Sequence, residues 1–287
     1  MVILEDLDFN ITIVGLGLMG GSYAMALKEL NPKNLWAVDI NEDTLKTAEE
    51  MGIINKGYTK PEVPLKDSDI VIIALYPKSA LRFVKDYINS FKSGAIITDI
   101  GGIKEEIVNE INSFLPDDLE FIGGHPMAGK EKQGLKYASK DIFTGASYIF
   151  TPVERNKEKN IQLLENIARK IGCKNTVRVN PKQHDEIIAL TSHLPHVIAV
   201  SLINSSDILN LETSLFVGGS FKDGTRVAEI NSSLWVELLI SNKKNILNTL
   251  DIFENNIKMI KNAIMENNCD FIKSEFEKAS LKRKELG

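Results

Sequence analysis

Residues 9–21 are Phe9-Asn10-Ile11-Thr12-Ile13-Val14-Gly15-Leu16-Gly17-Leu18-Met19-Gly20-Gly21. The first six form a β-branched, apolar run typical of a buried strand, and residues 22–30 favour a helix. The glycines therefore make a G-x-G-x-x-G turn between a strand and a helix, the setting of a dinucleotide-binding turn. We expect Gly15 to make the tight turn, Gly17 to admit a pyrophosphate and Gly20 to let the helix pack closely. Leu16, Leu18 and Met19 complete the predicted cofactor-binding turn.

An acidic residue, Asp39, follows a second strand expected at residues 35–38. A carboxylate at this place can bind the adenine-ribose hydroxyls and would repel the 2′-phosphate of NADP. The next residues, Ile40 and Asn41, supply no arginine for that phosphate, so we predict NAD as the cofactor. Asp39 could at the same time cap a helix beginning near Glu42, since the two roles are compatible.

Apolar strands and amphipathic helices continue to alternate as far as the turn pair Asn180-Pro181. We expect strands at 69–75, 95–100, 119–122, 148–152 and 176–179, and helices at 42–51, 78–91, 103–115 and 156–171. This alternation predicts an α/β fold: a Rossmann-type, doubly wound and mainly parallel sheet over residues 1–180. Ligands of such sheets bind beyond the carboxyl ends of the strands.

A loop rich in glycine, Gly123-Gly124-His125-Pro126-Met127-Ala128-Gly129-Lys130-Glu131, is expected after the strand at 119–122. Glycine permits positive φ angles and close backbone approach, and proline fixes the direction of the chain. The imidazole of His125 either serves a ligand there or only satisfies a local hydrogen bond. Its place at the carboxyl end of a strand, like those of Gly15, Asp39, Tyr76 and Gly101, favours a functional role.

From Lys182 onward the pattern is helical, which predicts an all-α C-terminal domain over residues 181–287. One apolar stripe recurs at intervals of three and four: Ile246, Leu250, Phe253, Ile257, Ile260 and Ile264. This stripe either packs inside the domain or forms a two-fold helical interface between two copies of the chain.

Two segments of the second half carry polar side chains in unusual settings. Ser192-His193-Leu194-Pro195-His196 places two histidines around a proline within a helical run. Gly218-Gly219-Ser220-Phe221-Lys222-Asp223-Gly224-Thr225-Arg226 is expected to form a glycine-rich turn with three charged residues. Arginine suits bidentate recognition of a carboxylate, although capping or a surface ion pair would explain each residue singly.

The composition restricts the class of protein. The 287 residues are 43% hydrophobic and 25% charged, with a formal net charge of −5, which argues against nucleic acid or an anionic membrane as the main partner. Cys173 and Cys269 lie far apart, so neither a zinc site nor a disulfide framework is indicated, and no metal is expected. Residues 1–9 lack the basic region of a signal peptide. We therefore expect a cytoplasmic protein that acts on a small molecule.

Taken together, these motifs resemble the prephenate dehydrogenase family of tyrosine biosynthesis. The resemblance covers residues 14–22, 99–104, 123–134, 184–196 and 218–235, and its most specific parts are 123–129, 192–196 and 221–226. It implies an NAD-dependent oxidative decarboxylation of prephenate to 4-hydroxyphenylpyruvate. Hydride would leave ring C4 for NAD+ while His125 accepts the hydroxyl proton. It also implies a homodimer formed through the C-terminal helices.

The resemblance assigns roles to further residues. Arg226 would bind a substrate carboxylate, His196 would lie near the substrate side chain, and Glu131 would stand at the entrance, where it could pair with Arg226. Trp235 would reach the active site of a partner subunit. Other expected substrate contacts are Gly102, Lys130, His193, Gly219 and Lys222, and other expected cofactor contacts are Tyr76 and Gly101.

Gly102 departs from the family pattern, because many members carry a serine there that is hydrogen-bonded to the catalytic histidine. We expect a water or a backbone group to replace that hydroxyl. The chain ends at Gly287, so we expect no regulatory ACT domain of the kind that some relatives append.

Three alternatives remain open at this point. An arogenate dehydrogenase, which gives tyrosine directly, differs only in the amino group on the substrate side chain. A β-hydroxyacid dehydrogenase would suit residues 16–20, but the G-x-G-x-x-x-K pattern of that group is not found after Pro181. A dinucleotide-sensing protein without catalysis would need neither His125 nor Arg226.

Overall fold

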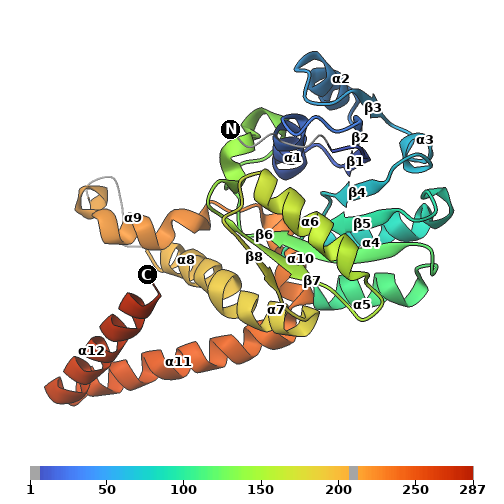
Figure 1. Ribbon diagram of the computed structural model, residues 1–287. Helices are drawn as coiled ribbons and strands as arrows, with labels where there is room; N and C mark the ends of the chain where they lie inside the picture. Colours follow the sequence, from blue (N-terminus) through green and yellow to red (C-terminus); the bar gives the residue numbers. More distant parts are fainter. Residues whose placement is uncertain (1–6, 207–212, 287) are drawn as a thin grey trace.

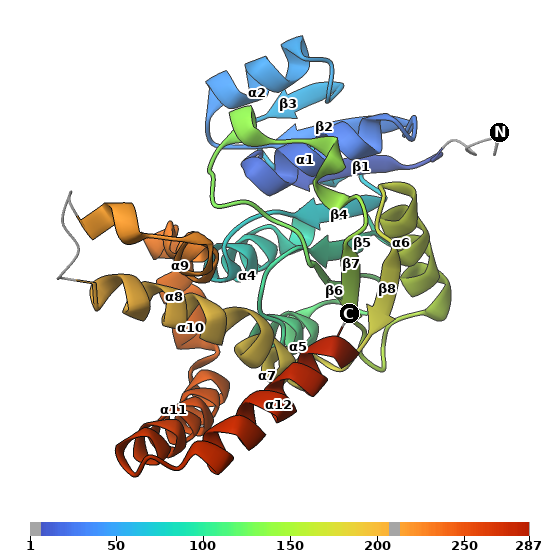
Figure 2. The ribbon, with the colours of Figure 1, turned by 90° about the vertical axis from the view of Figure 1, so that its left-hand side faces the viewer.

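The computed structural model describes residues 7–206 and 213–286. Its N-terminal part is a single sheet with the strand order β3-β2-β1-β4-β5-β6-β7-β8, and Figure 2 shows β3 near the top and the following strands below it. Only the β6–β7 pairing among these strands is antiparallel. The strands are β1 (Asn10–Val14), β2 (Asn34–Val38), β3 (Lys56–Tyr58), β4 (Ile70–Ile73), β5 (Ile96–Asp99), β6 (Glu120–Pro126), β7 (Ser147–Thr151) and β8 (Asn175–Arg178). The predicted doubly wound, mainly parallel sheet is confirmed.

Helices cover both faces of the sheet, which is why its strands are apolar on both sides. On β4, Ile70 and Ile72 pack toward α1 (Leu18–Lys28) and α6 (Glu158–Lys170). The alternate residues, Val71 and Ile73, pack toward the opposite layer. That layer consists of α3 (Glu62–Leu65), α4 (Pro77–Asp86) and α5 (Glu105–Phe114), while α2 (Glu42–Glu50) packs near β3 at the edge.

The segment from Gly123 to Pro126 belongs to β6, so the expectation that it forms a loop is wrong. His125 lies opposite Ile149 of β7 in the antiparallel ladder. The glycines serve close packing within the sheet. A Cβ on Gly123 would lie 2.3 Å from Thr151 Oγ1, and a Cβ on Gly124 would lie 2.7 Å from the Asp99 carbonyl oxygen. His125 is therefore held by a strand, which fixes its position more firmly than a loop would.

The C-terminal part is helical, as predicted. Its α-helices are α7 (Pro181–Ile188), α8 (Leu194–Asn204), α9 (Gly219–Thr225), α10 (Ser232–Ser241), α11 (Lys243–Met265) and α12 (Cys269–Glu285). A π-helical turn, Ala189–His193, joins α7 to α8. The glycine-rich turn expected at 218–226 is instead mostly helix α9, because Gly218 is its N-cap and the residues that follow adopt helical backbone angles.

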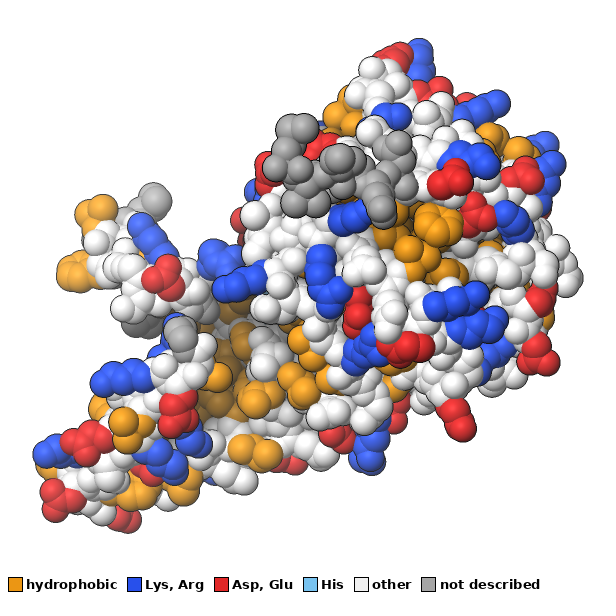
Figure 3. Space-filling model, in the orientation of Figure 1, with side chains coloured by type: hydrophobic (Ala, Val, Ile, Leu, Met, Phe, Trp, Pro, Cys, Tyr) orange, Lys and Arg blue, Asp and Glu red, His pale blue; other side chains and the backbone are white. Residues whose placement is uncertain are grey.

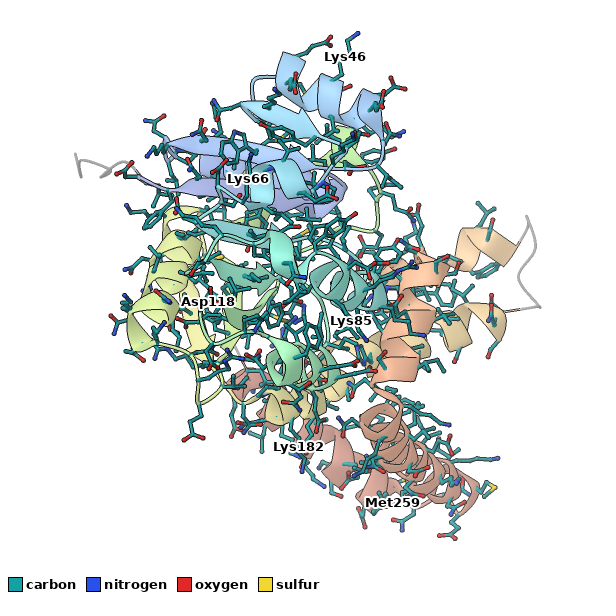
Figure 4. All side chains as sticks on the ribbon, turned by 90° about the vertical axis from the view of Figure 1, so that its right-hand side faces the viewer. Lys46, Lys66, Lys85, Asp118, Lys182 and Met259 are labelled. Carbon is teal, nitrogen blue, oxygen red and sulfur yellow. The ribbon has the colours of Figure 1, made fainter. Side chains whose placement is uncertain are left out.

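The helices α11 and α12 form an arm that projects away from the rest of the chain (Figure 1). Figure 4 labels Met259 on this arm, away from Lys182 at the start of α7. The apolar stripe of α11 divides accordingly. Ile246 is buried near the body, whereas Ile257 and Ile264 on the arm are 50% and 60% exposed. Packing inside the domain thus explains only the beginning of the stripe.

One described helical stretch, residues 181–204, has the length and apolar composition of a membrane-crossing helix. Its polar side chains argue for a place inside the protein instead. His184, Asp185 and His193 are each at most 3% exposed and form hydrogen bonds within the chain.

A buried ion pair lies beneath the carboxyl end of the sheet. The ammonium group of Lys104, at the start of α5, binds the carboxylate of Asp99 at the end of β5, and neither side chain is more than 2% exposed. Asp99 also accepts hydrogen bonds from the backbone N–H groups of Gly101 (2.9 Å) and Gly124 (3.2 Å). One carboxylate therefore joins β5, the turn after it and β6.

We predict that Lys104→Met lowers the free energy of unfolding by about 3–5 kcal/mol, because it leaves the buried Asp99 carboxylate without its cation. The matched control is Lys92→Met, which removes the half-exposed partner of Asp69 and should cost under about 1 kcal/mol. Urea denaturation of both variants measures the two changes. Equal losses in the free energy of unfolding would show that the buried ion pair contributes no more to stability than the exposed one.

Candidate active site

A cavity of about 820 Å³ lies between the carboxyl edge of the sheet and the C-terminal helices. Most residues predicted for the site line it. They are Gly17, Leu18, Met19, Gly20, Tyr76, Gly101, Gly102, His125, Lys130, Glu131, His193, His196, Arg226 and Trp235. Gly15 and Leu16 of the glycine turn and Asp39, which binds it, are not among the lining residues, and Gly219 and Lys222 lie on α9, also outside the lining. The cavity therefore brings segments from both halves of the chain together.

The glycine turn has the geometry that a dinucleotide requires. Gly15 adopts a φ angle of +92°, and its N–H donates to the Val38 carbonyl oxygen. A Cβ on Gly20 would lie 1.8 Å from the Gly15 carbonyl oxygen, so only glycine lets α1 begin this close to the turn. A Cβ on Gly17 would meet nothing within 4 Å. That open space in front of the N-terminus of α1 fits a pyrophosphate.

Asp39 supports the turn from the end of β2. Its Oδ2 accepts the Leu16 N–H at 2.7 Å and its Oδ1 accepts the Asn41 N–H at 2.9 Å. Helix α2 is capped by Asn41, whose side chain accepts from the Thr44 N–H, so the expectation that Asp39 could also cap this helix is wrong. An ionised carboxylate has room for further donors, which leaves Asp39 free to accept from ribose hydroxyls as well.

The imidazole of His125 faces the cavity from the end of β6. Its Nδ1 lies 2.9 Å from Nε2 of His184. Burial holds the pKa of His125 well below its ordinary value, and the neighbouring His184, Lys104 and His193 act in the same direction. His125 is therefore a neutral imidazole at neutral pH, and a neutral imidazole can accept a proton.

The second histidine segment forms the opposite wall of the cavity. His196 donates from Nδ1 to the Ser192 carbonyl oxygen (2.8 Å), and burial lowers its pKa. Its ring stacks on Trp235 of the same chain, with the ring centroids 3.7 Å apart. Trp235 thus contacts the site of its own chain, and its expected reach into a partner's site stays a prediction. Burial also lowers the pKa of His193, to about 4, and His193 accepts a hydrogen bond from Asn242.

Arg226 and Glu131 face each other at the mouth of the cavity. Their side chains form an ion pair with an N–O distance of 2.5 Å, and the Arg226 side chain is 66% exposed. The pair contacts only one terminal nitrogen of the guanidinium, Nη1. Because a guanidinium carries five N–H groups, the others remain available to a carboxylate.

Four buried residues beneath His125 were not predicted as site residues: Asp99, Lys104, His184 and Asp185. His184 donates to or accepts from His125, and Asp185 lies 2.6 Å from the other nitrogen of His184. The sequence offers a weak signal for them, because Asp99 is a charged residue near the end of an apolar strand and His184-Asp185 is an adjacent titratable pair. Both pairs lie in regular strand and helix patterns, and such patterns give no separate indication of a functional role.

Gly102 lies near the His125 ring but has no side chain that could form a hydrogen bond with it. A Cβ there would lie 3.5 Å from Leu238 and 4.0 Å from Cε1 of His125. The hydrogen bond that orients His125 comes from the side chain of His184 instead. The expectation that a water or a backbone group replaces the serine hydroxyl at Gly102 stays a prediction.

Comparison with known proteins agrees with this geometry. The family described as "Prephenate dehydrogenase, nucleotide-binding domain" matches residues 23–177, and "Prephenate dehydrogenase, dimerization domain" matches residues 180–278. Prephenate dehydrogenase of Bacillus subtilis (strain 168) is 30% identical over 281 residues, which cover 96% of this chain and 76% of the relative.

Two solved structures share the whole fold. Prephenate dehydrogenase from A. aeolicus, in complex with hydroxyphenyl propionate and NAD+, has a TM-score of 0.87 and 28% identity, covering 97% of this chain and 98% of that one. Arogenate dehydrogenase of Synechocystis has a TM-score of 0.83 and 25% identity, covering 96% and 99%. With both parts of the chain matched in order, this protein belongs to the prephenate dehydrogenase family.

Proposed function

We propose that this chain catalyses the oxidative decarboxylation of prephenate to 4-hydroxyphenylpyruvate, with NAD+ as the oxidant. The observation that carries the proposal is the neutral imidazole of His125, which shares one cavity with the glycine turn and with Arg226. The A. aeolicus relative binds NAD+ together with hydroxyphenyl propionate, an aromatic carboxylate that resembles the proposed product. The family membership sets aside the β-hydroxyacid dehydrogenase and the non-catalytic sensor.

The cofactor of this dehydrogenase is NAD. The pyrophosphate would lie in the open space at Gly17, and Asp39 would accept hydrogen bonds from the adenine ribose. When bound, NAD+ accepts the hydride from C4 of the substrate. We propose residues 1–180 as the dinucleotide-binding domain and residues 181–287 as the substrate and dimerisation domain. The last strand ends at Arg178 and α7 begins at Pro181, which supports this boundary.

His125 would act as the base that accepts a proton from the substrate and later returns it. Its free ring nitrogen accepts the C4 hydroxyl proton as the C4–H bond is lost as hydride, and the carbinol carbon becomes a carbonyl. The bond to the ring carboxylate then breaks, CO2 leaves, and its electron pair aromatises the ring. The C4 oxygen, now a phenolate, takes the proton back from His125. The step releases no net proton and returns His125 to its neutral form.

The cationic mouth of the cavity would bind the substrate carboxylates. Arg226 is held by Glu131 yet keeps free N–H groups, and Lys130 also lines the cavity. A guanidinium binds a carboxylate with two parallel hydrogen bonds, which fixes the orientation of the substrate as well as its position.

Arogenate is the second candidate substrate, and the tautomer of His196 favours it specifically. Because Nδ1 of His196 donates to the Ser192 carbonyl oxygen, Nε2 of the neutral ring is an acceptor. An acceptor at that point could take a hydrogen bond from the ammonium group that distinguishes arogenate from prephenate. The two substrates must therefore be compared directly.

The proposal is tested by following NADH formation with NAD+ and either prephenate or arogenate. We expect turnover with prephenate in the wild type and a loss in kcat of roughly 10²–10⁴-fold in His125→Asn, which keeps a polar side chain but lacks the base. The Kd of NAD+ should stay unchanged in the variant. Turnover with arogenate alone would reassign the substrate, and no turnover with either would refute the proposal.

We predict that the acid limb of kcat/KM lies below pH 6.5, because a depressed pKa keeps His125 unprotonated at lower pH than an ordinary imidazole. The groups that face it, His184, Lys104 and His193, all lower its pKa. Saturating NAD+ adds a positive nicotinamide ring, which acts in the same direction. An acid limb at or above pH 6.5 would contradict a base buried in this environment.

We propose that two copies of the chain associate through the arm formed by α11 and α12. Figure 3 shows hydrophobic side chains gathered in the hollow between the arm and the rest of the chain. Ile252, Ile257, Ile264 and Phe276 of the arm are all at least 50% exposed, which is unusual for an isolated chain. The family description of this part as a dimerization domain supports the same conclusion.

Ile257→Asp should shift the protein from dimer toward monomer, since it places a charge within an apolar interface. Light scattering over a range of concentrations gives the mass. The matched control, Lys258→Asp, changes a neighbouring residue that is already charged and exposed, and should leave the dimer intact. A wild type that is monomeric at all concentrations would refute the interface.

A further inference from the structure

Three side chains form a hydrogen-bonded chain that leads from the cavity into the protein. Nδ1 of His125 lies 2.9 Å from Nε2 of His184, and Nδ1 of His184 lies 2.6 Å from Oδ1 of Asp185. His184 and Asp185 are only 2% and 3% exposed. These hydrogen bonds connect the two parts of the protein, since His125 lies near the end of β6 whereas the other two residues belong to α7.

Asp185 can only accept hydrogen bonds in this arrangement. Its Oδ1 receives the backbone N–H of Lys104 (2.8 Å) and its Oδ2 that of Glu105 (2.9 Å). These are free N–H groups at the beginning of α5, where a negative charge is stabilised. Both oxygens of Asp185 thus already act as acceptors, which places the hydrogen of its short contact with His184 on Nδ1 of the imidazole.

This assignment determines the protonation of the next ring. With a single N–H, placed on Nδ1 by the contact with Asp185, His184 would present a lone pair on Nε2. That lone pair can only accept, so the hydrogen shared with His125 resides on Nδ1 of His125. The remaining nitrogen of His125, Nε2, then carries the lone pair that a base requires.

We propose that His184, held by Asp185, is the positioning residue for His125: it accepts the Nδ1–H of His125 and so keeps Nε2 free to take the substrate proton. The inference rests on the proposed role of His125 as the base. It also explains how the ring is oriented beside Gly102, which has no side chain to offer.

The hydrogen bonds from His125 to Asp185 would offset part of the cost that burial places on the protonated His125 formed during the reaction. When His125 takes up the proton, its Nδ1–H bond to His184 becomes charge-assisted, and such bonds are the stronger kind. The Asp185 carboxylate lies behind His184 with the opposite charge. The arrangement is similar in kind to the Asp–His pair of serine hydrolases, in which the carboxylate fixes the tautomer and stabilises the imidazolium.

Two substitutions at His184 distinguish a hydrogen-bonding role of this residue toward His125 from a role in filling space. In His184→Gln, the amide oxygen can still accept the Nδ1–H of His125, whereas His184→Leu fills the space without any acceptor. We expect kcat to fall about 10²–10⁴-fold in the leucine variant and less than about 10-fold in the glutamine variant. The KM for prephenate and the Kd of NAD+ should change by less than about 3-fold in both, because neither ligand is proposed to contact His184.

Equal losses in the two variants, or a leucine variant with wild-type kcat, would overturn the proposal. The tautomer itself can be measured in the unsubstituted enzyme, which removes any dependence on how well the variants fold. In ¹⁵N-histidine-labelled protein at neutral pH, NMR should show a protonated Nδ1 and an unprotonated Nε2 for His125. The reverse pattern would refute the positioning role of His184.

This measurement distinguishes the inference from the proposed function. An enzyme that turns over prephenate with the reverse tautomer would refute the role of His184 alone. The predicted tautomer in a protein that turns over neither substrate would leave the hydrogen-bonded chain in place and refute the reaction.

Discussion

The carboxylate of Asp99 is the constraint on which the site depends. It is buried at the end of β5, where an ionised group is tolerated only with full compensation. Lys104 supplies the counter-charge, and the N–H groups of Gly101 and Gly124 complete its hydrogen bonds. These partners come from three separate segments: the start of α5, the turn after β5 and the strand β6. Their convergence on one carboxylate fixes the backbone on which His125 stands.

A second carboxylate, Asp185, joins the helical part to the sheet in the same way. It accepts the first N–H groups of α5, while its own backbone carbonyl accepts from the Asn242 side chain. His184, next to it in sequence, thereby reaches His125 from the far side of the domain boundary. The position of His125 and the docking of the two parts are thus determined by the same few buried contacts. A cavity at such a junction can bind the dinucleotide on one wall and the acidic substrate on the other.

Local patterns in the sequence were sufficient for the sheet, the glycine turn and many of the lining residues, because strand alternation and glycine spacing are local properties. They failed where long-range contacts decide the structure. Gly123 and Gly124 suggested a loop, yet Thr151 and the backbone of Asp99 require glycine at these strand positions. The glycines near Gly219 suggested a turn and belong to α9. His184 was not predicted as a site residue because it lies within an ordinary helical pattern and its partner His125 is 59 residues away.

The most direct test of the proposed chemistry is to supply prephenate carrying deuterium at ring C4, together with NAD+. Transfer of that deuterium to the nicotinamide ring, with CO2 and 4-hydroxyphenylpyruvate formed in equal amounts, is the predicted result. Reduced cofactor without deuterium, or CO2 released without reduced cofactor, would contradict hydride transfer from C4 in the cavity beside His125.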